Sequence, residues 1–267
     1  MIKRYILTML VTLACCALLA QSRSAFRPVP QAKTQQEVND YNAAYASAGG
    51  AAREAAADNF AAKYPESELR SYLYSRAMHE YQNENNPGKI LATGEKILAL
   101  DPDNSVALAL TATVLADGLT EKDPDRDQKA ALIKRDCNRA LDTLESSMVL
   151  APGVTPEEIT AYKTSLGVMV HSALGIMELK TGNDSGAEKD LKAALKLNRL
   201  AGDATVYYHL ALAQDHQKKY SDALGSVEQA LQLASSNPEL QKLAEAEHER
   251  LQKLTGRRPG SGQSSSQ

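Results

Sequence analysis

Apolar side chains recur at three- and four-residue spacings along most of the chain, which is the pattern of helices with one buried face. The pattern predicts one long helix over residues 156–180 and a last helix over 238–254. Thr34 and Thr155 each stand three residues before a glutamate, the capping-box arrangement that starts a helix. Alanine is abundant and runs of β-branched residues are few, so the sequence predicts an all-α fold.

One stretch of the chain repeats itself at an offset of 36 residues. The repeated positions are small or aliphatic, and Gly175, Ala187, Leu191 and Ala194 match Ala211, Ala223, Val227 and Ala230. Such self-similarity is the sequence signature of an array of stacked helical units.

The spacing resembles the tetratricopeptide repeat (TPR), a helix–turn–helix unit of about 34 residues. The resemblance implies a right-handed α-solenoid of about five TPR-like helix pairs plus a C-terminal capping helix. It places small residues where two helices cross closely. The units it implies are 34–67, 71–104, 105–150, 156–201 and 204–237, with a cap at 238–254. In the third unit we expect an insertion at 117–126 and a second helix over 127–149.

The two ends of the chain differ from the repeats. A basic start and an apolar run of 15 residues, Ile6 to Ala20, predict a signal peptide over residues 1–22 and hence export to the periplasm or another extracytoplasmic space. Two alternatives stay open, which are a membrane-tethered lipoprotein lipidated at Cys15 and an uncleaved anchor. Residues 23–33 are a predicted linker. The Gly-, Ser- and Gln-rich residues 255–267 are a predicted disordered tail.

Candidate chemistry is sparse. The formal net charge is −3 with Lys and Arg spread along the chain, which argues against a nucleic-acid partner. The five histidines are scattered, and the acidic stretch 123–127 lacks the glycine and glutamate of a calcium loop. Cys137 occupies an apolar position of a helical pattern and is predicted to be a buried side chain. We therefore expect no cofactor, no metal and no enzymatic activity.

The resemblance also implies a concave groove lined by the first helix of each pair. The groove candidates it gives, position by position, are Tyr72, His79, Ile176, Leu179, Tyr208, Leu212 and Asp215. The aliphatic and aromatic members would form an apolar strip suited to a protein or peptide with an apolar or amphipathic segment. The competing interpretation is that the long helix 156–180 or the cap covers this strip.

These observations predict a non-catalytic protein–protein interaction scaffold of the cell envelope, with membrane contact only through the N-terminal segment. Residues 60–68 resemble a phrase of bacterial envelope-assembly repeat proteins, which makes an outer-membrane-biogenesis lipoprotein one alternative. A helical-array enzyme or ligand-binding protein is the other.

Overall fold

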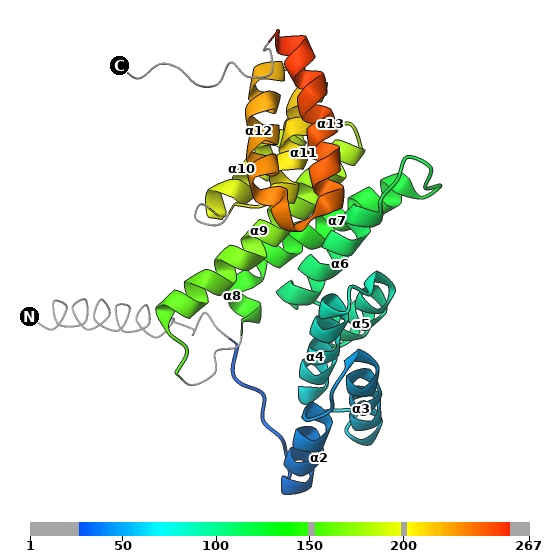
Figure 1. Cartoon of the computed structure of the whole chain (residues 1–267). Coiled ribbons are helices and arrows are strands. Elements are labelled where there is room, and N and C mark those ends of the chain that lie inside the picture. Colours follow the sequence, from blue (N-terminus) through cyan, green and yellow to red (C-terminus); the bar gives the residue numbers. More distant parts are fainter. Residues whose placement is uncertain (1–26, 149–152, 199–201, 257–267) are drawn as a thin grey trace, which may run out of the picture.

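The computed structural model describes residues 27–148, 153–198 and 202–256 (Figure 1). The predicted signal segment with Cys15, residues 23–26 of the linker and most of the predicted tail lie outside the described residues. The helices are α2 (Gln35–Tyr45), α3 (Gly50–Lys63), α4 (Leu69–Asn83), α5 (Pro87–Leu100), α6 (Ser105–Gly118), α7 (Arg126–Asp142), α8 (Leu144–Ser147), α9 (Pro156–Lys180), α10 (Asp184–Leu197), α11 (Ala204–His216), α12 (Tyr220–Leu233) and α13 (Pro238–Thr255), with a 3-10 turn at Ala234–Ser236.

The helices pack as successive pairs. The pairs are α2 with α3, α4 with α5, α6 with α7, α9 with α10, and α11 with α12, and α13 packs on the last of them. Figure 1 shows α2–α5 at one end of the molecule and α10–α13 at the other, with α6, α7 and the long α9 between them. In the part of the chain that the structure describes there is no strand, which confirms the all-α prediction. The paired packing resembles a TPR solenoid.

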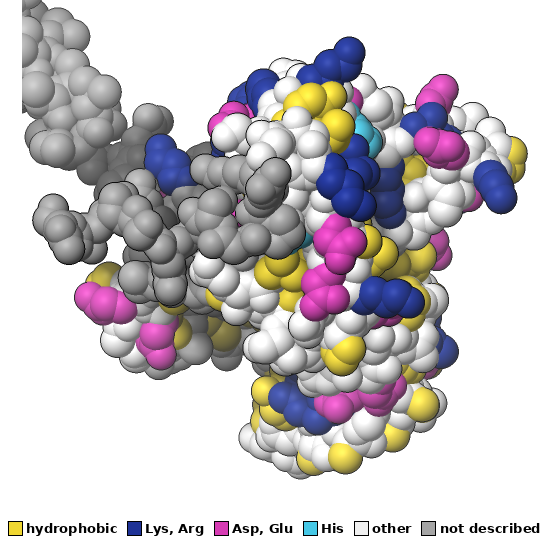
Figure 2. Space-filling model, turned by 45° about the horizontal axis from the view of Figure 1, so that its top comes forward, with side chains coloured by type: hydrophobic (Ala, Val, Ile, Leu, Met, Phe, Trp, Pro, Cys, Tyr) yellow, Lys and Arg dark blue, Asp and Glu magenta, His cyan; other side chains and the backbone are white. Residues whose placement is uncertain are grey.

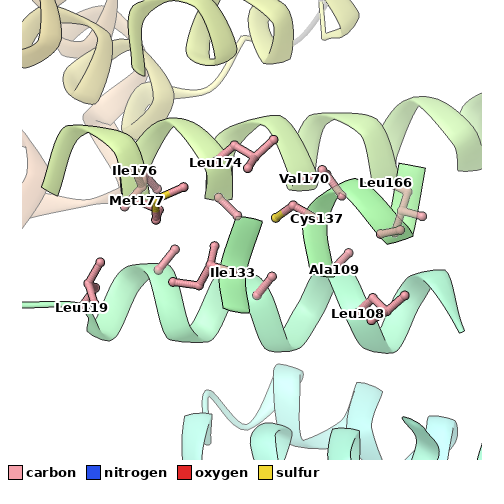
Figure 3. Packing of buried hydrophobic residues seen from close by; sticks show 14 residues of the cluster. Leu108, Ala109, Leu119, Ile133, Cys137, Leu166, Val170, Leu174, Ile176 and Met177 are labelled. Carbon is pink, nitrogen blue, oxygen red and sulfur yellow. The ribbon is translucent and has the colours of Figure 1, made fainter. Parts of the chain in front are cut away.

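The apolar core follows the chain as four clusters, each shared by neighbouring helices. The cluster formed by α6, α7 and α9 is drawn in Figure 3, where Ile133 and Cys137 of α7 lie between the other two helices. Both side chains are fully buried. A core that passes from one pair to the next makes each unit depend on its neighbours for burial.

Small residues allow close approach where the repeat predicted it. A Cβ atom built on Gly175 of α9 would lie 2.5 Å from Cγ of Leu191 in α10. Leu191 is itself fully buried, and so is Ala187 beside it. A larger side chain at residue 175 would therefore force α9 and α10 apart.

The helix predicted over residues 127–149 is interrupted at Thr143 and does not reach Met148. Helix α7 ends at Asp142, and only the single turn of α8 follows. The hydroxyl and the backbone N–H of Thr143 both donate to the carbonyl of Arg139, at 2.7 Å and 2.9 Å. Beyond α8 the backbone of Met148 is extended, and its side chain is 6% exposed.

The predicted insertion is fixed to the end of α9. Nζ of Lys180 donates to the carbonyls of Ala116 at 3.0 Å and Asp117 at 2.6 Å, and Arg126 donates to the carbonyl of Lys180. Within the loop, the carboxylate of Asp123 accepts from the backbone N–H of Thr120 at 3.0 Å. The acidic residues of this loop thus contribute to its internal structure.

The two predicted capping boxes differ. At α9, the Thr155 hydroxyl accepts from the N–H of Glu158 and the Glu158 carboxylate accepts from the N–H of Thr155 at 2.8 Å, so the box is complete. At α2, the Thr34 hydroxyl accepts from the N–H of Glu37, but the Glu37 carboxylate accepts from the N–H of Lys33, one residue before the cap.

Candidate functional site

A cleft of about 420 Å³ lies between α4 and the first turns of α9. Tyr72, Ser75 and His79 contribute to it from one face of α4, since residues three and four apart lie on the same side of a helix. Glu158, Ile159 and Tyr162 of α9, together with Val154, form the opposite wall. Between the walls lie Ser71, Asp101, Asn104, Ser105, Val106, Ser147 and Met148. We call this space the α4–α9 cleft.

The turn between α5 and α6 gives the cleft its polar rim. Asn104 is the N-cap of α6, and its side-chain oxygen accepts from the N–H of Ala107 at 3.0 Å. The same side chain donates to the carboxylate of Asp101 at 3.4 Å. The hydroxyl of Ser147 donates to that of Ser105 at 2.8 Å and so holds α8 against the start of α6. These bonds fix Met148 at the edge of the cleft.

An extended segment, residues 27–33, runs beside the cleft and is called the strap below. The guanidinium of Arg27 forms an ion pair with Asp101 at 2.6 Å, and its backbone N–H donates to the carbonyl of Met148 at 2.9 Å. Residues 27–31 also line a second cavity, of about 440 Å³, with α4 residues that include Ser71 and Tyr72. The strap is therefore held by Arg27 at one end and by its connection to α2 at the other.

The cleft holds two acidic side chains, one of which is paired. Among its described lining residues the acids are Asp101 and Glu158, and Arg27 of the strap pairs with Asp101 at 2.6 Å. Burial raises the pKa of Tyr72 to about 12, so this phenol stays neutral in the physiological range. On the face drawn in Figure 2, basic and acidic side chains lie beside one another.

The structure separates the residues that the sequence placed in one groove. Tyr72 and His79 line the α4–α9 cleft. Ile176 and Leu179 are 5% and 9% exposed and belong to the cores around α9. They do not lie on an open face, because α9 packs against α6 and α7 on one side and α10 on the other.

The remaining candidates lie on α11. Leu212 is half-buried against the core shared by α9, α10 and α11, and Tyr208 is half-buried against the core below α13. Asp215 forms an ion pair with Arg250 of α13. Neighbouring helices thus bury the two α9 members of the expected apolar strip, whereas Tyr208 and Leu212 on α11 stay half-buried.

Sequence reasoning missed the contributions of Arg27, Asp101 and Tyr162. Asp101 begins an Asp-Pro-Asp-Asn stretch, which the sequence alone marks only as a turn. Arg27 belongs to an Arg-Pro-Val-Pro stretch whose two prolines favour an extended backbone, and this was the available signal for a strap. The position of Tyr162 near α4 follows from the long α9 crossing the array, which no local pattern specifies.

Two observations limit other kinds of site. In residues 27–148, 153–198 and 202–256, no group of three or more His, Cys, Asp or Glu side chains is arranged to hold a metal ion. Over the same ranges, no helix has both the length and the apolar character that crossing a bilayer requires.

No protein-family model matches the sequence, and no curated protein matches it. Several solved structures align with it, and three of them are described here. TTC0263, described as a thermophilic TPR protein in Thermus thermophilus, is 16% identical, and the alignment covers 79% of this chain and 98% of that one with a TM-score of 0.42. The MamA RS-1 ArsTM double mutant is 14% identical over 70% of this chain and 94% of that one, with a TM-score of 0.41. MamA protein is 14% identical over 74% and 98%, with a TM-score of 0.38.

These TM-scores are below 0.5, so the description of this chain rests on its own helix pairs. Their order, the small residues at the helix crossings and the capping helix make it a TPR-like repeat protein. Stacked helical repeats in general present extended surfaces that can bind partners.

Proposed function

We propose that this chain is a non-catalytic protein-interaction scaffold of the cell envelope and that it binds an extended segment of a partner protein in the α4–α9 cleft. The observation that carries the proposal is the cleft itself, which is a concave space with apolar side chains on its walls and hydroxyl, amide and carboxylate groups on its rim. Recessed sites with a few placed polar groups are where proteins bind ligands.

The chemistry of the cleft favours recognition over turnover. Its polar groups are engaged in holding the fold: Asn104 caps α6, Glu158 caps α9, and Asp101 pairs with Arg27. The exposed apolar members, Val154 and Tyr162, are 37% and 39% exposed. An apolar or amphipathic partner segment would bury these side chains and gain free energy from doing so.

The envelope location is supported by the sequence of residues 1–22 and is tested by fractionation and intact mass. Recovery from a soluble extracytoplasmic fraction with an N-terminus near Gln21 is the expected result. A chain that begins at an acylated Cys15 would favour the envelope-assembly lipoprotein instead. An unprocessed chain in the cytoplasm would overturn the envelope role. The phrase at 60–68 is used structurally, since Phe60 is 4% exposed and the Tyr64 hydroxyl donates to Asp40 at 2.6 Å.

The binding site is tested by photo-crosslinking in the native host. A crosslinking residue at Tyr162 should capture a partner, whereas one at Leu243, which is 48% exposed on α13, should not. The variant Val154→Glu should lower the yield at residue 162, because it places a charge in the apolar wall. Equal yields from residues 162 and 243, or no effect of Val154→Glu, would contradict a partner site in the cleft.

A further inference from the structure

The strap places an extended, proline-containing segment beside the helix that forms one wall of the α4–α9 cleft. Its first residues are Arg27, Pro28, Val29 and Pro30. A proline ring fixes its own φ angle at about −65°, and it also drives the residue before it away from helical conformations. All four residues therefore favour polyproline II, an extended conformation that has no internal hydrogen bonds.

The α4–α9 cleft continues the surface on which the strap lies. Tyr72 of α4 lines both the cleft and the second cavity, whose lining includes Pro28 and Pro30. On the opposite wall of the cleft a second aromatic residue, Tyr162, is 39% exposed. Segments in the polyproline II conformation generally bind in grooves lined by aromatic side chains. The cleft offers two such side chains next to a segment of this kind that the fold already holds.

The polar groups of the cleft that are still free to bind a partner lie on α4. Asp101 pairs with Arg27 and Glu158 caps α9, so neither carboxylate is counted toward a partner. No hydrogen bond joins the Tyr72 hydroxyl or the His79 ring to another described residue, and both line the cleft. A phenol and an imidazole can each donate a hydrogen bond. The backbone carbonyls of a polyproline II segment are unpaired within the segment and can accept it.

The size of the cleft also favours an extended occupant. A cube of 420 Å³ is about 7.5 Å on an edge, and polyproline II advances about 3.1 Å per residue, so about two to three residues fit. An α-helix with its side chains is about 10–12 Å wide and would not enter. Within the part of the chain that the structure describes there is no strand whose edge a β-strand of a partner could extend.

We propose that the occupant of the α4–α9 cleft is a proline-containing segment of the partner protein, bound in the polyproline II conformation between Tyr72 and Tyr162. This inference rests on the proposed function for the identity of the cleft as a binding site. It adds the chemistry by which the partner is recognised, which is proline rings against two phenol rings and backbone carbonyls against donors on α4.

The test uses the absence of tryptophan from the chain. Tyr162→Trp places a single indole in the wall of the cleft, and Leu243→Trp places one on α13, where the native side chain is 48% exposed. The probe is a blocked, uncharged peptide of Gln-Pro-Val-Pro repeats, and its matched control has alanine in place of every proline. The probe should change the emission of Tyr162→Trp saturably and leave that of Leu243→Trp unchanged. It should bind about tenfold more tightly than the control, because proline has already lost much of the backbone entropy that binding costs.

A second substitution locates the bound peptide. Tyr72→Phe in the Tyr162→Trp background removes one hydroxyl and keeps the ring, so it should weaken the probe by about twofold to tenfold, the value of one hydrogen bond. Tyr208→Phe is the matched control, because it makes the same change on α11, away from the cleft. Equal affinity for the two peptides, no response of Tyr162→Trp, or equal effects of Tyr72→Phe and Tyr208→Phe would each overturn the proposal.

The partner experiment separates this inference from the proposed function. The proline peptide should lower the photo-crosslinking yield at residue 162, and the alanine peptide should not. Capture of a partner that the proline peptide does not compete with would overturn the polyproline II occupant and leave the binding site standing. Binding of the proline peptide without capture of any partner would support the chemistry of the cleft and count against the proposed function.

Discussion

The close contact of α9 with α10 predicts opposite effects for the same substitution at two glycines. Gly175 and Gly225 both lie inside helices, and replacing either by alanine should gain up to about 1 kcal/mol from backbone entropy and helix propensity. At Gly225 a new Cβ would meet nothing within 4 Å. Gly225→Ala should therefore stabilise the protein by about 0.5–1 kcal/mol.

At Gly175 the steric term outweighs this gain. The new Cβ would lie 2.5 Å from Cγ and 2.9 Å from Cδ2 of Leu191, and 3.3 Å from the carbonyl oxygen of Ala187. Cγ is the branch point of the side chain, and Leu191 is fully buried, so the clash cannot be relieved by rotating a flexible end outward. Overpacking of this kind costs about 1–3 kcal/mol. If overpacking costs about 2–3 kcal/mol and the improved helix propensity returns up to about 1 kcal/mol, Gly175→Ala lowers the free energy of unfolding by about 1–2 kcal/mol.

The assay is urea unfolding followed by far-UV circular dichroism, with hydrogen exchange of the α9 and α10 amides to locate the loss. The two variants should differ by about 2–3 kcal/mol, which is about 1 M in the urea midpoint for ordinary slopes. Leu191→Ala removes the obstructing side chain, so Gly175→Ala should cost less stability in the Leu191→Ala background than in the wild-type chain. The difference between the two costs is the coupling energy of the two sites. If Gly175→Ala raises the midpoint as much as Gly225→Ala does, close helix crossing is not the reason for the small residue.

Three further predictions concern buried ionisable groups. Burial alone would raise the pKa of Glu54 and of Glu188, but hydrogen bonds lower both pKa values to about 2. The donors to Glu54 are Tyr81, Lys89 and Lys96. The donors to Glu188 are Lys192, Lys219 and Gln217. Each carboxylate should contribute at most about 3 kcal/mol to the free energy of unfolding. This contribution is complete above the pKa of the unfolded state, near 4.5, and is lost as the pH falls toward 2. The urea midpoint of Glu54→Gln should therefore fall less steeply on acidification than that of the wild-type chain. Burial lowers the pKa of His209 to about 4, so the unfolded chain binds this proton more readily than the folded chain does. The free energy of unfolding should therefore fall by at most about 3 kcal/mol as the pH drops from 6.5 to 4. If a His209→Gln variant shows the same decline, this residue is not its source. Burial also raises the pKa of Cys137 to about 12, so iodoacetamide should leave Cys137 unmodified in the folded chain and label it in urea, as read by peptide mass. Rapid labelling of Cys137 under native conditions would show that the core around α7 opens.

The elements of the fold could be predicted because the signals for them are local. The capping box at Thr155, the unbroken pattern over 156–180 and the 36-residue repeat of small residues are all read along one segment, and α9 to α12 follow them closely. At Met148, beyond α8, the chain instead makes contacts with distant segments, such as the hydrogen bond from the N–H of Arg27 to the carbonyl of Met148. No period in the sequence encodes those contacts.

The site was less predictable for a related reason. A position in a repeat tells which helix face a residue occupies but not which neighbour covers that face. Ile176 and Leu179 have the spacing of a concave surface, yet the length of α9 brings them into cores on both of its sides. Tyr72 and His79 instead line the open space between α4 and the start of α9.

The bond from Lys180 to the end of α6 has a consequence for the order in which the molecule is made. The last carbonyls of a helix need a partner. That of Ala116 accepts locally from the N–H of Leu119 at 3.3 Å and also from Nζ of Lys180, whereas that of Asp117 accepts from Lys180, which lies 63 positions further along the chain. A ribosome delivers α6 long before it delivers Lys180, so the Asp117 carbonyl is without this partner through the synthesis of α7, α8 and most of α9. The contact between the end of α6 and Lys180 cannot form until α9, the first helix of the fourth pair, has been synthesised. A ribosome stall between α7 and the end of α9 would leave this contact unformed.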